Sequence, residues 1–309
     1  MLFRSSLLFY EFSKDYDMDN LLLEILKDLR EVKRSDLEFV QRIQFYGRTL
    51  WHARQIKGDY DLAKIREAVA ITDKANAMVL RNLKPGMNEA EIHALLEFEY
   101  MKAGHTSGYG SIVAGGVNAT ILHYTLNNAR LMPETMLLID SGCEVELFSA
   151  DVTRCYPVDG VFSPKSKDIY AIVLEANKRA IAQCRPGSNI ENVHEAAKGV
   201  LADGLESIGL KSADIDKFYM HRTSHWLGMD VHDVGRYQHN GKPFAFEPGM
   251  VLTVEPGLYF NSDFSGINTP FDGIGVRIED DILITENGHE VLSSNIPKEM
   301  DEIESRMHS

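Results

Sequence analysis

Cysteine is scarce in this sequence. Its 309 residues include only Cys143, Cys155 and Cys184, with no Cys-X-X-Cys pair among them. An odd number of widely spaced cysteines does not suit a framework of structural disulfides. The sequence therefore predicts a reduced protein of the cytoplasm, in which Cys143 and Cys155 are small core residues.

Long apolar runs and positive charge are lacking as well. No stretch approaches the roughly 18 apolar residues that a membrane-spanning helix needs, and the apolar segment 7–10 is too short for the core of a secretion signal. Lysine and arginine total 32 against 46 aspartate and glutamate residues, which gives a net charge of −14. Such a surface repels phosphate backbones and anionic lipids, so we expect neither nucleic acid nor a membrane as a partner.

The composition that remains is that of an ordinary globular protein. Hydrophobic residues make up 44% and charged residues 25% of the chain, which is long enough to bury a substantial core. Apolar positions recur at helical spacing over 18–32 and again over 36–45. Residues 1–15 show no periodicity, and residues 298–309 are expected to form a short polar tail.

From residue 59 onward, predicted helices and strands alternate in a regular order. The expected helices form two pairs, at 60–82 with 89–102 and at 164–184 with 190–208. The expected strands follow each pair, at 111–120, 131–140 and 145–158 and then at 250–260, 275–285 and 289–294. Because the order helix, helix, strands occurs twice, we expect an α+β fold with two related halves that face each other.

Four acidic residues interrupt strand-like apolar segments, where an unpaired charge would be costly to bury. They are Asp140, Asp151, Glu255 and Glu279. Asp140 and Asp151 are 11 positions apart across a break at Gly142, which suits two adjacent antiparallel strands that direct both carboxylates into one cavity. Any one of the four could equally be an ordinary carboxylate at a strand end, so this pair alone does not identify a site.

The segment 221–235, HRTSHWLGMDVHDVG, adds three histidines to these carboxylates. Four carboxylates and one imidazole form an oxygen-rich ligand set that suits hard or borderline divalent cations. Four negative charges would match two such cations, and without metal the carboxylates would repel one another. Apart from His123 and the three histidines of this segment, the histidines are expected to be ordinary core or surface residues. They are His52, His93, His105, His194, His239, His289 and His308.

The order Asp140, Asp151, His225, Glu255, Glu279, at intervals of 11, 74, 30 and 24 residues, resembles the five metal ligands of the pita-bread metallopeptidases. The surrounding segments IDSG, DVTRCYPV, SHWLGMDVHDVG, TVEPGLYF and GVRIEDD are similar to the branch of Xaa-Pro aminopeptidases (aminopeptidase P) and prolidases, more than to methionine aminopeptidase. The resemblance covers about residues 50 to 300. It implies a pita-bread fold of the α+β class, with two pseudo-symmetric halves around a cleft that holds two metal ions.

The resemblance implies a metal-binding role for each of the five residues. Asp140 would hold one metal ion, while His225 and Glu255 would hold the other. Asp151 and Glu279 would bridge the two ions. The implied cofactor is a pair of divalent cations, for which Mn²⁺ is the expected metal and Co²⁺ or Zn²⁺ would fit similar ligands.

The resemblance also implies how the peptide bond is cleaved. A hydroxide that bridges the metal ions would attack the scissile carbonyl, with Glu255 as proton acceptor and shuttle to the leaving nitrogen. His232 would stabilise the oxyanion, and His123 would face the substrate near the leaving group. His221 would line the proline pocket, and Arg277 would orient a polar group of the substrate.

The implied activity is the removal of an N-terminal residue that precedes proline. The implied partners are therefore peptides with proline at the second position. Two alternatives stay open: a prolidase restricted to Xaa-Pro dipeptides, and an inactive fragment or non-catalytic binding module with the same fold.

Two features depart from the family pattern. Relatives usually carry a sizeable N-terminal domain, whereas only about 50 residues precede the catalytic domain here. We therefore expect residues 1–50 to be a helical remnant of that domain, residues 51–309 to form the pita-bread catalytic domain, and the assembly to be a homodimer. Arg222 stands where relatives usually have glycine, and a bulky cation there would narrow the proline pocket or recruit an acidic group.

Overall fold

The computed structural model describes residues 7–31, 40, 42–45 and 47–308. It contains two compact units, Met1–Ala53 and Arg54–Ser309. In the first unit, strand β1 (Leu7–Phe9) pairs in parallel with β2 (Arg42–Gln44). Helix α1 (Tyr16–Glu31) confirms the helix expected over 18–32, and helix α2 (Gly47–Gln55) begins in this unit.

Two expectations for the first unit are corrected by the strand pair. The helical spacing over 36–45 is misleading at its end, because Arg42–Gln44 are extended in β2, while residues 36–39 and 41 lie outside the described residues. The segment 1–15, in which no element was expected, contains β1. A parallel strand pair depends on a partner more than 30 positions away, which local periodicity does not report.

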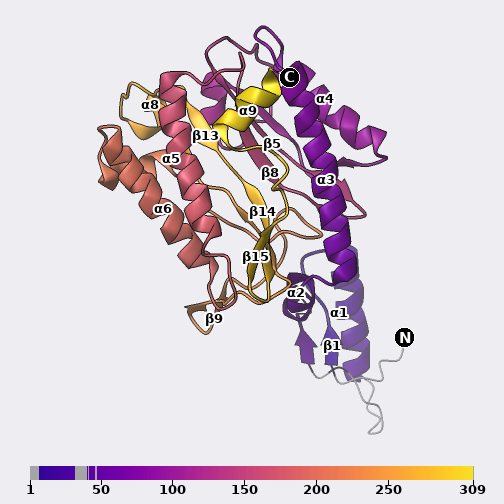
Figure 1. The fold of residues 1–309 in the computed structure, drawn as a ribbon. Helices are drawn as coiled ribbons and strands as arrows, with labels where there is room; N and C mark the ends of the chain where they lie inside the picture. Colours follow the sequence, from indigo (N-terminus) through magenta and orange to yellow (C-terminus); the bar gives the residue numbers. More distant parts are fainter. Residues whose placement is uncertain (1–6, 32–39, 41, 46, 309) are drawn as a thin grey trace. The chain divides into compact units, whose positions relative to one another are not determined.

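Two pairs of helices stand on either side of the strands in the second unit (Figure 1). Helix α3 (Asp59–Asn82) packs against α4 (Glu89–Lys102), and α5 (Pro164–Ile181) packs against α6 (Ile190–Ser207). All four expected helices are confirmed, although α5 ends three residues before the expected position 184. The first turns of α4, α5 and α6 are stabilised by caps, because Asn88, Ser163 and Asn189 each accept a hydrogen bond from a backbone N–H in the first turn.

Short antiparallel sheets lie between the helix pairs. One sheet has the order β4 (Ile112–Gly115), β5 (Met136–Ser141), β8 (Val152–Pro157), and the other has the order β11 (Val251–Val254), β14 (Asp280–Thr285), β15 (Gly288–Val291). Helix α4 contacts β4 and helix α5 contacts β11, so each half joins its own helix pair to its own sheet. The halves meet where β8 contacts β14 and where β13 (Gly275–Arg277) contacts β5 and β8.

The remaining elements are short. They are β3 (Thr106–Ser107), β6 (Cys143–Val145), β7 (Phe148–Ser149), β9 (Gln238–His239), β10 (Lys242–Pro243), β12 (Gly257–Tyr259), η1 (Gly116–Thr120), η2 (Ser212–Asp214), α7 (Ile215–Phe218), α8 (Ser262–Ser265) and α9 (Met300–Met307). Strand β6 pairs with β3 and β7, β9 pairs with β10, and β12 pairs with β13.

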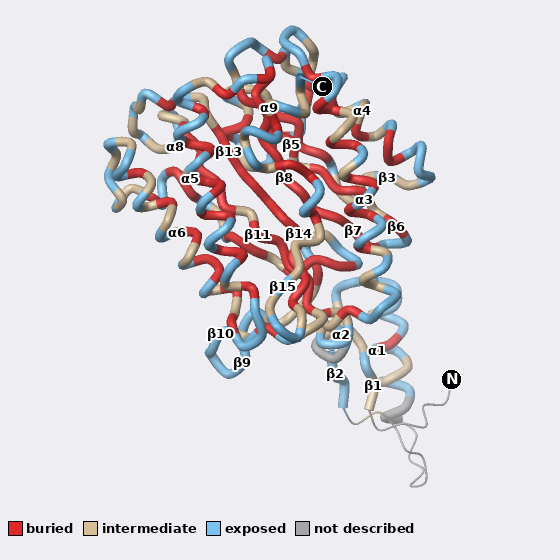
Figure 2. The backbone as a smooth tube through the Cα atoms, viewed as in Figure 1, coloured by how far each residue is buried: buried red, intermediate tan, exposed pale blue. Residues whose placement is uncertain are grey.

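The core of the second unit runs through these sheets and the inner faces of the helices (Figure 2). Cys143 and Cys155 are buried free thiols, as predicted, and so is Cys184. Burial raises the pKa of both Cys143 and Cys155 to about 12, so these thiols stay protonated. Across the described residues, the helices lack the combination of length and apolar character that crossing a membrane requires.

Two expectations for the second unit are wrong. The expected strand over 111–120 ends at Gly115, because Gly116 has a φ of 56° and the chain continues as the 3₁₀-helix η1. The expected polar tail 298–309 contains helix α9, which contacts α3 and fully buries Ile303. Met300, Ile303 and Met307 follow helical spacing, a short apolar pattern within a polar segment.

Candidate metal centre

Asp140 and Asp151 come from adjacent antiparallel strands. Asp140 lies in β5 opposite Thr153 of β8, and Asp151 directly precedes β8. The connection passes Gly142, where a Cβ atom would lie 1.8 Å from the carbonyl oxygen of Ala150. Only glycine permits this close approach, which brings the two aspartates to one side of the sheet as their spacing predicted.

The hydroxyl of Tyr109 lies between the two aspartates. It is 2.6 Å from Oδ1 of Asp140 and 2.6 Å from Oδ1 of Asp151. Burial and then the charges of both aspartates raise the pKa of this phenol well above its usual value, so it stays a donor. Sequence reasoning missed Tyr109, for which the available signal is its place between Gly108 and Gly110.

His225 and Glu255 lie side by side because the segment before Trp226 runs along β11. The N–H groups of Thr253 and Glu255 donate to the carbonyl oxygens of His225 and Thr223 at 3.0 and 2.8 Å. Nε2 of His225 is 3.4 Å from Oε1 of Glu255, and Nδ1 is 3.1 Å from the carbonyl oxygen of Trp226. Since a carbonyl only accepts, Nδ1 carries a proton and Nε2 faces the carboxylates.

The donor set fits divalent cations. One ligand atom each from Asp151, His225 and Glu279 can be chosen so that all lie within 4.8 Å of one another. A histidine that donates one ring N–H to a backbone carbonyl while its other nitrogen faces carboxylates is typical of metal sites. Burial and then the charges of Asp151 and Glu255 raise the pKa of Glu279 well above its usual value, and burial raises that of Glu255 to about 7. Cations would relieve this repulsion between buried carboxylates.

Arg277 and Thr153 donate hydrogen bonds to the carboxylates of Asp140 and Glu279. The guanidinium of Arg277 donates to Oδ2 of Asp140 at 2.6 Å, to the hydroxyl of Thr153 at 3.0 Å and to that of Tyr259 at 3.1 Å. Thr153 in turn donates to Oε2 of Glu279 at 2.6 Å. Arg277, which was expected to orient the substrate, thus has protein partners at all three guanidinium nitrogens. Sequence reasoning missed Thr153 and Tyr259, because no motif distinguishes them from other strand residues.

The three accessory histidines are held to different degrees. His221 is fixed, since Nδ1 lies 2.8 Å from the carbonyl oxygen of Arg222 and Nε2 lies 2.8 Å from the hydroxyl of Tyr259. Burial and then the charge of Arg277 lower the pKa of His221 to about 3, so its ring is neutral. His123 and His232 make no hydrogen bond within the part of the chain that the structure describes, which leaves both rings available to a ligand.

A single cavity of about 830 Å³ gathers the expected residues. Its lining includes every site residue that the sequence predicted: Asp140, Asp151, His225, Glu255, Glu279, His123, His221, His232 and Arg277. This volume lies in the range of small-molecule sites. The lining of the cavity combines acidic residues with apolar ones, which include Ile112, Leu122 and Val231. The arrangement can therefore hold cations and a short ligand together.

Arg222 lines the same cavity from its exposed side. Its guanidinium pairs with the carboxylate of Glu191 in α6, and 57% of its side chain is exposed. The acidic partner expected for Arg222 is therefore Glu191 of the same chain.

Comparisons with known proteins agree with this geometry. Residues 63–286 match the model of metallopeptidase family M24. The Xaa-Pro aminopeptidase of Haemophilus influenzae is 39% identical over 265 residues, which cover 82% of this chain and 61% of that relative. The Xaa-Pro aminopeptidase of Escherichia coli is 36% identical over 299 residues, which cover 94% of this chain and 67% of that relative. The chain thus spans about three fifths of the first relative and two thirds of the second.

Solved structures are similar over nearly the whole chain. Aminopeptidase PepP of Pseudomonas aeruginosa has a TM-score of 0.92 at 38% identity. The match covers 98% of this chain and 71% of the PepP chain. Proline aminopeptidase P II of Yersinia pestis has a TM-score of 0.93 at 36% identity, with coverage of 99% and 72%. A zinc-substituted aminopeptidase P of Escherichia coli in complex with product has a TM-score of 0.92 at 35% identity, with coverage of 98% and 71%. These matches confirm the pita-bread fold of the α+β class.

Proposed function

Because this chain belongs to metallopeptidase family M24, we propose that it is a metal-dependent Xaa-Pro aminopeptidase, which hydrolyses the bond between an N-terminal residue and a following proline. The observation that carries the proposal is one cavity lined by four carboxylates, by His225 and by two further histidines, His123 and His232, that make no hydrogen bond among the described residues. The printed names of the relatives from Haemophilus influenzae and Escherichia coli support the choice of substrate. Peptides with proline at the second position are the proposed partners.

Two divalent cations are the proposed cofactor. Asp140 would hold one ion, His225 and Glu255 the other, and Asp151 and Glu279 both. When bound, the ions supply Lewis-acid polarisation of the scissile carbonyl and lower the pKa of water. Mn²⁺ is the proposed native metal, and Co²⁺ or Zn²⁺ would suit the same oxygen and nitrogen donors.

The side chains around the cations move protons and orient the peptide. Glu255 accepts a proton from the attacking water and delivers it to the leaving proline nitrogen. His232 donates a hydrogen bond to the developing oxyanion, and His123 contacts the substrate near the leaving group. His221, neutral and tied to Tyr259, forms a wall for the proline ring. Arg277 donates to Asp140 and would keep this carboxylate in place, while the two guanidinium N–H groups that its three protein contacts leave over would orient the polar end of the substrate.

The proposed catalytic domain is 51–309, with 1–50 as an N-terminal extension. The matched segment 63–286 lies wholly inside the proposed domain, which supports this boundary. The buried free cysteines support a reducing compartment, and the cytoplasm is the proposed location. The net charge of −14 supports the absence of nucleic acid and membrane partners. A homodimer is the proposed assembly.

The test is hydrolysis of three substrates by the purified, Mn²⁺-loaded chain: an Xaa-Pro-Yaa tripeptide, an Xaa-Pro dipeptide and a peptide that begins Met-Ala. We expect release of the first residue from the tripeptide, loss of that activity with a chelator, and its return with Mn²⁺. An Asp151→Asn variant should bind less metal and be inactive, while Asp159→Asn, at an exposed turn, should match the wild type.

Each other outcome would assign this chain a different function. Cleavage of the dipeptide alone would identify a prolidase. Two bound metal ions without turnover of any substrate would identify a non-catalytic member of the family. Cleavage of the Met-Ala peptide alone would contradict the assignment to the aminopeptidase P branch.

A further inference from the structure

Asn177 of helix α5 connects two segments that each lead into a predicted metal ligand. Its side chain is fully buried, and its Nδ2 donates to the carbonyl oxygen of Val254 at 3.1 Å and to that of Ile278 at 3.2 Å. Val254 directly precedes Glu255, and Ile278 directly precedes Glu279. One amide group therefore joins the two points in the backbone from which the two glutamates project.

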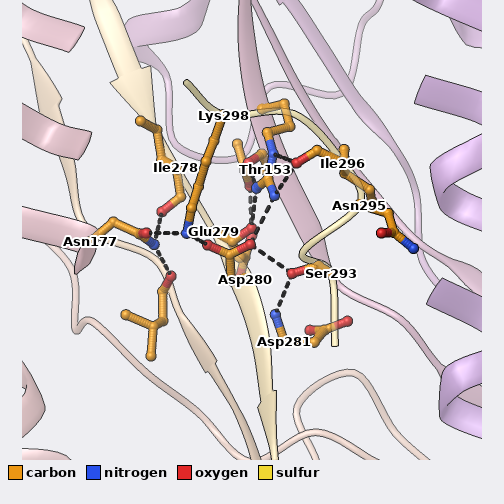
Figure 3. Close-up of polar contacts among 12 residues, drawn as sticks. Thr153, Asn177, Ile278, Glu279, Asp280, Asp281, Ser293, Asn295, Ile296 and Lys298 are labelled. Atoms are coloured by element: carbon orange, nitrogen blue, oxygen red, sulfur yellow. Dashed lines mark hydrogen bonds and ion pairs between the residues drawn. The ribbon is translucent and has the colours of Figure 1, made fainter. Parts of the chain in front are cut away.

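Lys298 determines which way this amide faces. Its Nζ donates to Oδ1 of Asn177 at 2.8 Å and to Oδ2 of Asp280 at 2.5 Å (Figure 3). An ammonium group has only donors, so the side of the amide that meets Lys298 must be its oxygen. The NH₂ group is then left to face the two carbonyl oxygens, and the assignment of the amide follows from its partners.

A buried set of charges holds Lys298 and the backbone of Glu279 in turn. Asp280, which is fully buried, accepts hydrogen bonds from Nη2 of Arg154 at 2.8 Å and from the hydroxyl of Ser293 at 2.6 Å. Nη1 of Arg154 donates to the carbonyl oxygen of Glu279 at 2.5 Å. The peptide groups on both sides of Glu279 are thus fixed, one by Asn177 and the other by Arg154.

We propose that Asn177 is a positioning residue that sets the spacing between Glu255 and Glu279, and that Lys298 holds its amide in the orientation which this spacing requires. The inference rests on the proposed role of these glutamates as metal ligands. Neither Asn177 nor Lys298 lines the cavity, so both act through the backbone of the strands that carry the ligands. Metal ligands need this support, since a loose ligand shell lowers affinity for the cation.

The chain offers a matched control for the loss of a buried amide. Asn76 of helix α3 is 1% exposed, donates to the carbonyl oxygen of Thr72 at 3.0 Å and accepts from the hydroxyl of Tyr156 at 2.9 Å. It shares residue type, burial and helical setting with Asn177. Neither of its partners is adjacent to a predicted ligand in the sequence.

The experiment compares Asn177→Leu with Asn76→Leu in the full chain. Isothermal titration calorimetry gives the dissociation constants for Mn²⁺, and urea denaturation of the metal-free protein gives the free energy of unfolding. We expect both variants to lose stability, and only Asn177→Leu to raise the dissociation constant for Mn²⁺, by roughly 10-fold to 100-fold as for other residues that support metal ligands. Equal effects of the two variants on Mn²⁺ binding, or none in Asn177→Leu, would overturn the inference.

A second pair of variants keeps the inference testable if Asn177→Leu does not fold. Lys298→Met should weaken Mn²⁺ binding because the amide is then free to turn, and Lys298→Arg should restore it because a donor cation returns. Equal Mn²⁺ affinity in Lys298→Met and the wild type would contradict the role of Lys298. Absence of Mn²⁺ binding in the wild type would instead overturn the proposed function, on which the inference depends.

Discussion

Two histidines four positions apart have opposite electrostatic environments. Burial lowers the pKa of His221 to about 3, and the nearby charge of Arg277 acts in the same direction. Burial also acts to lower the pKa of His225, but the hydrogen bond with Asp151 and the charge of Glu255 outweigh it and raise the pKa to about 9. The neutral His221 suits an apolar ring beside it, whereas His225 faces negative charge that a cation would balance.

His232 is the residue whose role is most directly testable. Its ring meets that of His225 edge-on at 4.4 Å between centroids, and burial lowers its pKa. We expect His232→Gln to lower kcat for an Xaa-Pro-Yaa tripeptide by about 100-fold or more, the range for loss of a donor to an oxyanion. The dissociation constant for Mn²⁺ should not change, because His232 is not a proposed ligand.

The control for this variant is His93→Gln, at a partly exposed position of α4. Steady-state kinetics and calorimetry of both variants separate catalysis from metal binding. Weakened Mn²⁺ binding in His232→Gln would mean that His232 supports the metal instead of the oxyanion.

At the scale of single elements, α9 shows how a short polar helix can belong to the core. It contacts α3 and buries Ile303 completely, and the segment before it supplies Ile296 and Lys298 to the charges around Asp280. Residues 296–307 are thus packed against the core of the second unit and do not form a free tail.

We expect Ile303→Ala to lower the free energy of unfolding by about 2 to 5 kcal/mol, the usual cost of removing a buried isoleucine side chain. Urea denaturation at neutral pH measures the change. Glu302→Ala, in the same helix but exposed, should cost far less because its ion pair with Arg306 lies at the surface. A loss of unfolding free energy in Ile303→Ala as small as that in Glu302→Ala would show that α9 adds little to the core.

His194 joins helix α6 to the segment that leads to His225. Its Nδ1 is 2.8 Å from the hydroxyl of Thr223, which is also 2.5 Å from the hydroxyl of Tyr219. Burial and then the charge of Arg222 lower the pKa of His194 in the folded state. A histidine in the unfolded chain has a pKa of about 6.5, so as the pH falls the unfolded state binds a proton at this residue more readily than the folded state does. The stability that this group contributes is therefore present above that pKa and is lost as the pH falls below it.

We expect the wild type to lose more stability than His194→Gln when the pH is lowered from about 7.5 to about 5.5, across the pKa of an unfolded histidine. Urea denaturation of both proteins at both pH values gives the difference, and subtraction removes the contribution of groups common to the two. Parallel pH dependence of wild type and variant would contradict the assignment of this effect to His194.

At the scale of the whole second unit, the candidate centre lies where its two halves meet. Asp140 and Asp151 come from the sheet of the first half, and Glu255 and Glu279 adjoin strands of the second. Cations that bind all four carboxylates would therefore tie the halves together. In the metal-free protein, burial raises the pKa of Glu255 from 4.5 to about 7, so the stability from this group is present below pH 4.5 and is lost as the pH rises through about 7.

We expect Mn²⁺ at about 100 times its dissociation constant to stabilise the protein by about 2.7 kcal/mol per site, and a chelator to reverse the gain. The measurement is the shift in Tm of the apo protein at pH values above about 7, where Glu255 is ionised. Asp151→Asn should show a smaller shift because a proposed bridging ligand is lost. An equal shift in wild type and variant would place the stabilising Mn²⁺ elsewhere.

The sequence by itself determined the features that depend on neighbouring residues. Helix starts at 89, 164 and 190 could be predicted because the residues that cap a helix lie within a few positions of it. The candidate ligands could be named because charged residues in apolar strands are rare and their order resembles a known family.

Only the tertiary structure decided the contacts between residues far apart in the sequence. Local patterns do not name the partners in these contacts, which are the two aspartates for the hydroxyl of Tyr109, β2 for β1 and α3 for α9. The amide of Asn177 meets Lys298 from 121 positions away. Periodicity and spacing describe which face of an element is apolar, but the partner of a buried polar group is chosen by packing, which brings together whatever donors and acceptors the fold places within reach.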